Sequence, residues 1–158
     1  MKIMCVLVLF FAVFNLFSLE SVFIGIGPEL NANTRQGAAL GGAIAAGLDL
    51  NRNFATGIKT GFFYDFKTVT ALETEGFFRY YIPLTIRGLF IQAETGAVVF
   101  FEYGKPYPAF IGSLAAGWRI NIGSMGFLEP SIRSGYPFAW GLGLLGGIMF
   151  DMKKSGGN

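Results

Sequence analysis

Histidine is absent from the 158 residues of this chain, and cysteine occurs once, at Cys5. Without histidine, the Ser–His pairing that activates a nucleophile is unavailable, and no zinc-type ligand cluster can form. Charged residues make up 14% of the chain, and its lysines and arginines are too scattered for a nucleic-acid-binding patch. Glu73 and Glu75 could suggest acid–base catalysis, but no pocket is evident, so we interpret them as a solvated or salt-bridged pair. We therefore expect no enzyme, no cofactor, no metal and no nucleic-acid partner.

The first residues differ from the rest of the chain. Lys2 is followed by a long apolar run, and Ser18 or Ser21 supplies a small residue for cleavage. The pattern predicts a secretory signal peptide over residues 1–20. An N-terminal membrane anchor is the alternative, because no A-x-A stands at the junction. Cys5 would leave with the signal, so the mature chain would carry no thiol into an oxidising compartment.

Beyond this leader the chain has no stretch that resembles a transmembrane helix, but it has regular alternation. In the segment that begins at Gly88, one parity is uncharged and apolar: Leu89, Ile91, Ala93, Thr95, Ala97, Val99, Phe101 and Tyr103. The other parity carries the charges: Phe90, Gln92, Glu94, Gly96, Val98, Phe100 and Glu102. A period of two indicates an extended strand with two unlike faces. A continuous apolar face is typical of a strand that meets lipid while its polar face points inward.

Eight strand candidates of this kind follow one another, separated by short turn signals. They are Val22–Ala32, Gly37–Leu50, Phe54–Phe66, Val69–Ile82, Gly88–Tyr103, Ala109–Ile122, Met125–Gly135 and Phe138–Phe150. Because unpaired backbone groups are not tolerated in hydrocarbon, the set predicts a closed sheet. The fold class is therefore all-β, an eight-stranded antiparallel up-and-down transmembrane β-barrel over residues 21–150, with a short periplasmic tail over residues 151–158. Pro130 lacks a backbone donor and marks the weakest strand or a bulge.

A soluble lipocalin-like barrel also has eight antiparallel strands, with the faces reversed. That arrangement would crowd Trp118, Trp140 and many leucines into a small interior. It would also leave glycines such as Gly141 and Gly143 on the solvent face without a reason. The sequence therefore favours the membrane barrel.

Aromatic residues cluster near the ends of the predicted strands. One set is expected at the inner rim: Phe54, Tyr80, Trp118 and Phe150. Another is expected at the outer rim: Tyr64, Phe66, Phe101, Tyr103, Phe138 and Trp140. Amphipathic rings at both membrane interfaces form the girdles of such barrels.

The inward parity gathers a network of charges in the lumen. Its predicted members are Glu29, Lys59, Glu73, Glu75, Arg79, Glu94, Arg119, Glu129 and Arg133, and Asp49 shares this parity. We expect Lys59 to reach Glu73 or Glu75, Arg79 to approach Glu94, Arg119 to approach Glu129, and Arg133 to extend toward Glu29. An eight-stranded barrel is just wide enough for side chains to fill it. A plugged interior is therefore favoured over a conducting channel.

With leader, eight strands and girdles, the chain resembles the small eight-stranded outer-membrane β-barrels of the OmpX and OmpA transmembrane type, over nearly its whole mature length. The last strand, GLGLLGGIMF, ends at Phe150 and is similar to the aromatic-terminated strand that the barrel-assembly machinery recognises in that family. The resemblance implies the outer membrane of a diderm, Gram-negative-type bacterium, with outer-membrane lipid as a partner. Two features depart from it: residues 151–158 follow the terminal aromatic, and every predicted outer connection is short.

The function expected from these observations is a structural or surface-contact role in the cell envelope, carried out by a barrel with a salt-bridged lumen. The alternatives are a small outer-membrane pore for ions or small solutes and a secreted lipocalin-like lipid-binding barrel.

Overall fold

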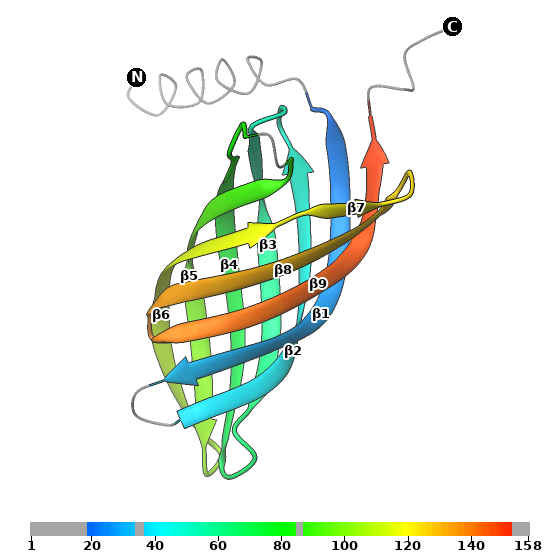
Figure 1. Ribbon diagram of the computed structural model, residues 1–158. Helices are drawn as coiled ribbons and strands as arrows, with labels where there is room; N and C mark the ends of the chain where they lie inside the picture. The colour runs from blue at the N-terminus through cyan, green and yellow to red at the C-terminus, as the bar shows by residue number, and fades with distance from the viewer. Residues whose placement is uncertain (1–18, 34–36, 85–86, 153–158) are drawn as a thin grey trace, which may run out of the picture.

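The computed structural model describes residues 19–33, 37–84 and 87–152. The predicted signal peptide lies outside these ranges apart from its last two residues. Nine strands occur in the described residues: β1 (Ser21–Asn33), β2 (Gly37–Asp49), β3 (Phe54–Tyr64), β4 (Val69–Tyr81), β5 (Leu89–Glu102), β6 (Lys105–Trp118), β7 (Ile120–Ile122), β8 (Gly126–Tyr136) and β9 (Trp140–Asp151). They form one antiparallel sheet in the order β6-β5-β4-β3-β2-β1-β9-β8-β7, and the pairing of β6 with β8 closes it. Figure 1 shows the resulting barrel, with the start of β1 and the end of β9 at the same end.

The predicted eight-stranded antiparallel barrel is confirmed, since β6 and β7 are two pieces of one staggered strand. β6 pairs with β8 as far as Gly117 opposite Ser131, and β7 resumes the same register at Ile120 opposite Leu128. Pro130 lies in the gap and has no N–H to bond across it. The predicted sixth strand is therefore broken at Arg119, whose N–H bonds to the Gly88 carbonyl at 2.8 Å instead.

A second proline interrupts the wall between β1 and β9. The pairing runs from Ser21 to Ile26 and resumes at Glu29, so Gly27 and Pro28 are left out of the ladder. The two interruptions flank the β8–β9 hairpin on its two sides, which leaves that hairpin with fewer ladder bonds than the strands around it.

The turn between β5 and β6 was predicted too far along the chain. The predicted strands Gly88–Tyr103 and Ala109–Ile122 left residues 104–108 between them, but β6 begins at Lys105. The turn consists of Tyr103 and Gly104, which have φ of 49° and 77°. Positive φ at both central residues is the type I′ geometry that suits the twist of a two-residue hairpin, so the strands continue to its edge.

The register fixes how strongly the strands tilt. Following residue pairs around the closed sheet from Pro106 leads back to the same strand at Ala116, ten residues further along. A displacement of this size requires the strands to tilt by roughly 35–45° to the barrel axis. Inward side chains from distant parts of the sequence are thereby brought to the same level.

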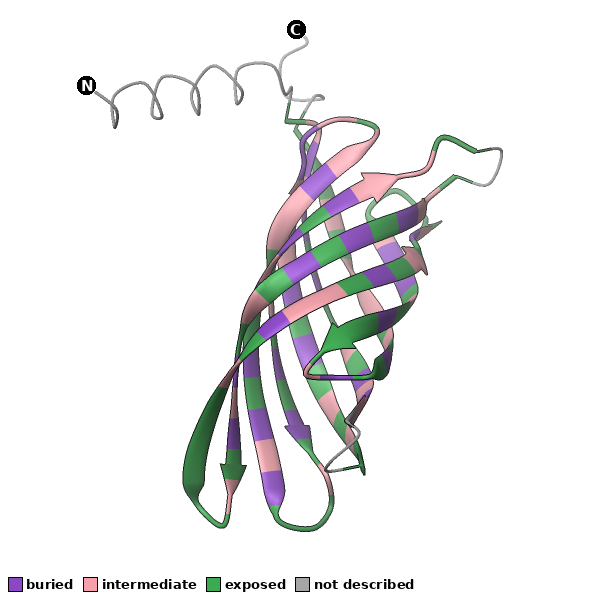
Figure 2. Cartoon of the chain, turned by 90° about the vertical axis from the view of Figure 1, so that its left-hand side faces the viewer, coloured by how far each residue is buried: buried purple, intermediate pink, exposed green. Residues whose placement is uncertain are grey.

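Burial alternates along the strands, as the coloured bands of Figure 2 show. The outward residues are large and apolar; Leu114 is 70% exposed and Ile58 is 64% exposed. The inward residues include Phe63 and Phe90, which are almost fully buried, together with most of the charges. This is the reverse of the soluble lipocalin-like alternative. Among the described residues, no helix is long and apolar enough to cross a membrane.

Two apolar layers close the interior. Near the end that carries the described termini, called here the terminal end, Phe23, Ala55, Phe77 and Phe127 pack together. Toward the opposite end a second layer contains Phe63, Val69, Ala71, Val98, Phe100, Ile111 and Phe138. Phe138 was expected in the outer aromatic girdle, and that prediction was wrong. It is 6% exposed and turns inward, because its ring packs against the rings of Phe63 and Phe100.

Candidate functional site

Most of the inward charges lie in two groups, one in the middle of the barrel and one beside the apolar layer at the terminal end. The first, called here the acid-rich cluster, contains Glu29, Lys59, Glu73, Glu75, Glu94 and Arg133. The second, the balanced cluster, contains Asp49, Arg79, Arg119 and Glu129. Each brings together strands from different sides of the barrel.

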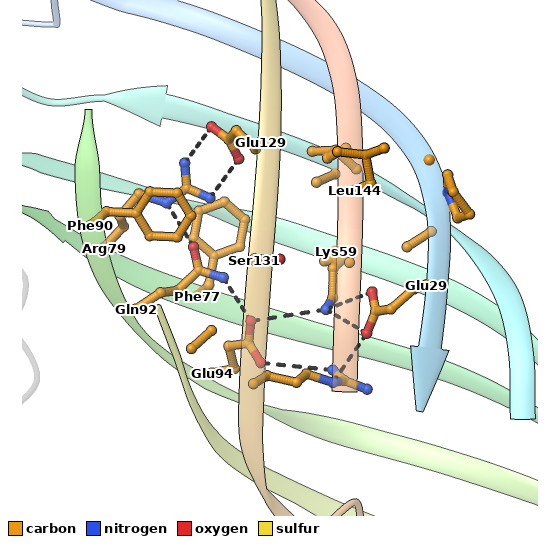
Figure 3. Close-up of a pocket in the computed structure, with 18 residues that line it drawn as sticks. Glu29, Lys59, Phe77, Arg79, Phe90, Gln92, Glu94, Glu129, Ser131 and Leu144 are labelled. Atoms are coloured by element: carbon orange, nitrogen blue, oxygen red, sulfur yellow. Dashed lines mark hydrogen bonds and ion pairs between the residues drawn. The ribbon is translucent and has the colours of Figure 1, made fainter. Parts of the chain in front are cut away.

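Lys59 on β3 stands among the carboxylates of the acid-rich cluster. Its Nζ lies 2.7 Å from Glu75 Oε1 and 3.2 Å from Glu29 Oε2. Glu73 and Glu94 are further away, at 3.8 and 3.9 Å. Figure 3 shows the lysine between Glu29 and Glu94, which come from opposite parts of the wall.

Arg133 on β8 is the second cation of this cluster. Its Nη2 donates to Glu73 Oε2 at 2.8 Å, and its Nε lies 3.1 Å from Glu29 Oε1. Its Nη1 donates to Glu75 Oε1 at 3.2 Å. A Cβ on Gly141 of β9 would stand 3.0 Å from Arg133 Cγ, so the glycine leaves room for the arginine stem. A guanidinium suits this position because its fork of donors can serve several carboxylates at once.

The balanced cluster makes two links across the lumen. One joins β4 to β8, and the other joins the break between β6 and β7 to β2. Arg79 donates to both oxygens of Glu129, at 2.8 and 3.0 Å. Arg119 donates from Nε to Glu129 and from Nη1 to Asp49 at 3.0 Å. Both guanidinium planes also lie against aromatic rings, and the Cζ of Arg79 is 3.8 Å from the centre of the Phe90 ring. Paired charges with stacked faces are the form in which arginine is stably buried.

Gln92 on β5 connects the two clusters. Its Oε1 accepts from Arg79 Nε at 2.8 Å, and its Nε2 donates to Glu94 Oε1 at 2.7 Å. Asn31 plays a similar part beside Arg133, accepting from its Nε at 3.0 Å. Neither residue was predicted as a network member, although both share the inward parity that could have identified them, whereas Asp49 was predicted to face inward.

Three of the four expected pairings occur. Lys59 contacts Glu75, Arg119 contacts Glu129, and Arg133 contacts Glu29. The expected pairing of Arg79 with Glu94 was wrong, because Arg79 bonds to Glu129 across the lumen. The stagger of the sheet brings residues 50 positions apart to the same level, whereas we had assumed that neighbouring strands would pair.

Little space remains in the middle of the barrel. The central cavity, lined in part by Lys59, Glu94, Arg133 and Ser131, has a volume of about 40 Å³. At the terminal end a wide vestibule of about 950 Å³ opens over Tyr81 and Arg119. In the part of the chain that the structure describes, no group of three or more acidic or sulfur-bearing side chains is arranged to hold a metal ion. The arrangement holds paired charges in the lumen and leaves more space at the terminal end than in the centre.

Neither a family model nor a curated protein matches the sequence. Solved structures do match it. The N-terminal β-barrel domain of Pseudomonas aeruginosa OprF is 19% identical, with a TM-score of 0.58 over 84% of this chain and 98% of that one. Neisserial surface protein A is 12% identical, with a TM-score of 0.60 over 84% and 97%. The outer-membrane protein OprG from Pseudomonas aeruginosa is 6% identical, with a TM-score of 0.60 over 85% and 97%.

The chain has the fold of the small eight-stranded outer-membrane barrels. At these identities the likeness concerns the fold alone, and the position of individual side chains must come from this structure.

In this outer-membrane barrel fold, the predicted girdle residues lie toward the two ends of the strands. Phe54, Tyr80, Trp118 and Phe150 are at the terminal end, and Tyr64, Phe101, Tyr103 and Trp140 are at the other. Trp118 is 41% exposed and donates from Nε1 to the Arg87 carbonyl at 2.8 Å. Tyr103 is 79% exposed at the tip of the β5–β6 hairpin. A ring with an apolar body and one polar contact is suited to a membrane–water boundary.

Proposed function

We propose that this chain is an outer-membrane barrel whose lumen is filled and cross-braced by side chains, and that it has a structural or surface-contact role in the cell envelope without catalysis. The observation that carries the proposal is the span of the arginines. Arg79 on β4 pairs with Glu129 on β8, and Arg119, between β6 and β7, pairs with Asp49 on β2. The central cavity that remains has a volume of only about 40 Å³. Buried pairs of this kind are held in place because separating them would strand a charge out of water.

The exterior supports a membrane position. Exposed apolar side chains surround the barrel. Because the sheet is closed, nearly every backbone group along the strands faces a neighbouring strand with which it can hydrogen-bond. We further propose that the terminal end faces the periplasm after removal of a leader over residues 1–20, that outer-membrane lipid surrounds the wall, and that assembly machinery recognises β9. Residues 151–158 would then form a periplasmic tail, of which β9 takes up Asp151.

A small pore is the second candidate, and the vestibule favours it. A mouth of about 950 Å³ is large enough to admit hydrated ions as far as Arg119. The two candidates differ only in whether ions pass the charged clusters beyond that point.

Conductance in planar bilayers distinguishes them. The refolded wild-type barrel should show no steady openings, whereas a Lys59→Ala/Arg133→Ala double variant, which loses both cations of the acid-rich cluster, should conduct. Met125→Ala, in the turn before β8, serves as a control that should stay closed. Heat-modifiable gel mobility would establish that each variant is folded. Steady openings in the wild-type protein, lost on Arg79→Ala substitution, would overturn the plugged barrel in favour of the pore.

A further inference from the structure

The acid-rich cluster carries more negative charge than its cations can neutralise. Four carboxylates, of Glu29, Glu73, Glu75 and Glu94, face one lysine and one arginine. In the described part of the chain these are the only cations within 4.0 Å of the four. If every group were ionised, two negative charges would remain uncompensated. The balanced cluster has no such surplus, with two arginines against two carboxylates.

The carboxylates of this cluster are buried. Glu73 is 0% exposed, Glu75 is 1% exposed and Glu94 is 5% exposed. An isolated carboxylate is so costly to bury that the group takes up a proton instead of remaining charged. The cluster is therefore expected to reduce its charge unless a further cation enters it.

One further cation, Arg79 of β4, lines the central cavity, but it pairs with Glu129 of β8, so the remaining described elements bring no unpaired positive charge to the cluster. The groups that face it are Glu29 and Asn31 from β1, Lys59 from β3, Glu73 and Glu75 from β4, Gln92 and Glu94 from β5, Ser113 from β6, and Ser131 and Arg133 from β8. β2 and β9 line the same cavity with alanine, glycine and leucine. Ser113 and Gln92 both donate to Glu94, at 2.5 and 2.7 Å, which favours its ionised form.

Glu73 is the carboxylate least supported as an anion. Its Oε2 accepts from Arg133 at 2.8 Å, but its Oε1 is buried and has no hydrogen-bond partner. Lys59 Nζ stands 3.8 Å from that oxygen and is committed more closely to Glu75. A buried oxygen that accepts nothing is where added charge is least stabilised.

We propose that the acid-rich cluster is a proton-binding site, and that at neutral pH it holds a proton on Glu73. In the unfolded chain all four glutamates are ionised at pH 7. The folded barrel therefore binds one proton more than the unfolded chain. Its stability falls as pH rises, and the unfolding constant increases up to tenfold per pH unit while that difference lasts.

The sequence makes this measurable. Because the chain has no histidine, the thiol of Cys5 is the one ordinary side chain that titrates between about pH 6 and 9, and a Cys5→Ser background removes it. Urea unfolding of the refolded full chain in lipid vesicles, followed by the fluorescence of its two tryptophans, would give the unfolding constant across this interval. We expect the wild-type constant to increase with pH.

The decisive variant is Glu73→Gln, which resembles the protonated acid in shape and charge. It should abolish the pH slope and be at least as stable as wild type at the alkaline end. Glu129→Gln in the balanced cluster is the matched control, and it should lower stability throughout while keeping the slope. A pH-independent wild-type barrel, or a Glu73→Gln variant with the wild-type slope, would overturn the proposal.

A second measurement does not depend on any variant folding. Infrared spectra of the wild-type barrel in deuterated buffer at neutral pH should contain the C=O band of a protonated carboxyl group, and that band should disappear on alkaline titration. A spectrum without the band at neutral pH would overturn the proposal even if Glu73→Gln failed to refold.

Discussion

At the scale of single residues, the direction of a side chain follows from the sequence more reliably than its partner does. Alternation placed Arg79, Glu94 and Glu129 in the lumen, and all three are buried there. It could not show that Arg79 crosses to Glu129, because parity contains no information on how far neighbouring strands are displaced. Neutral members such as Gln92 were not predicted, because only charged residues were assigned to the network.

The facing of Leu142 leads to a stability prediction. Leu142 is 47% exposed on the outer face of β9, so an arginine there would meet hydrocarbon. We expect Leu142→Arg to lower the free energy of unfolding in lipid by about 2–4 kcal/mol. Met125 has nearly the same exposure, 46%, but lies in the turn before β8 at the barrel end. Met125→Arg should cost about 0–1 kcal/mol. Equal effects of the two substitutions in urea unfolding would contradict the assignment of the lipid-facing surface.

Asp65 in the β3–β4 turn gives a pH-dependent prediction outside the membrane-spanning strands. Its Oδ1 accepts from the N–H groups of Lys67, Thr68 and Val69 at 2.8, 3.0 and 3.0 Å. Burial acts to raise the pKa of Asp65, but these donors and the charge of Lys67 outweigh it and hold the pKa below its ordinary value. The carboxylate therefore stabilises the barrel above its unfolded-state pKa, and this contribution is lost as pH falls through the folded-state pKa.

Asp65→Ala should accordingly destabilise the barrel by about 1 kcal/mol at neutral pH. The difference from wild type should shrink below about pH 4, where the unfolded aspartate is protonated. Thr68→Ala is the control, since only the backbone of Thr68 bonds to the carboxylate. A difference in the free energy of unfolding between wild type and Asp65→Ala that increased as the pH fell would contradict the lowered pKa of Asp65.

At the scale of elements, the sequence predicts where strands run but not where their ladders are interrupted. Pro130 was recognised as a weak point, and the structure shows the consequence in the neighbouring strand, where β6 ends and β7 begins. The first predicted strand, Val22–Ala32, ran through Pro28 without any interruption. A proline cannot donate a hydrogen bond to one of its two neighbouring strands. Which strand loses that bond depends on the register of the sheet.

The glycines of β9 provide a test at the same scale. A Cβ on Gly147 would collide with the Ile24 carbonyl oxygen and the Phe127 ring. On the adjacent Gly146 nothing lies closer than 3.8 Å. We expect Gly147→Ala to destabilise the barrel by about 1–3 kcal/mol, through forced movement of β1 and β9, and Gly146→Ala to be nearly neutral. Thermal unfolding of the two variants measures this, and the reverse order would refute the assignment of inner and outer faces in β9.

At the scale of the whole molecule, strand number, closure and the inverted faces were predictable because hydrocarbon leaves few alternatives for an alternating sequence. The stagger of ten residues was not predictable, nor was the difference in volume between the open vestibule and the closed centre. Both depend on how side chains of different size fit together across the lumen, such as Phe63 with Phe138 at one end and Arg119 with Asp49 toward the other.

That difference in volume predicts unequal access for a water-soluble maleimide. Asn121 lines the open vestibule, whereas Ser131 lines the closed centre. In a chain with Cys5 replaced by serine, Asn121→Cys should react quickly, and Ser131→Cys should react only at the rate of native-state opening. Mass spectrometry of the labelled protein measures both rates, and denaturation in urea should make them equal. Rapid labelling of Ser131→Cys in the folded barrel would show a water-filled centre.

The arginines that span the lumen also affect the mechanics of the tube. Arg119 and Asp49 join strands on opposite sides of the ring, and Arg79 with Glu129 adds a second diagonal. A thin cylinder under lateral compression from lipid tends to flatten into an ellipse, and diagonal struts resist that change of cross-section. The roundness of this tube thus depends on four side chains as well as on its hydrogen-bonded wall.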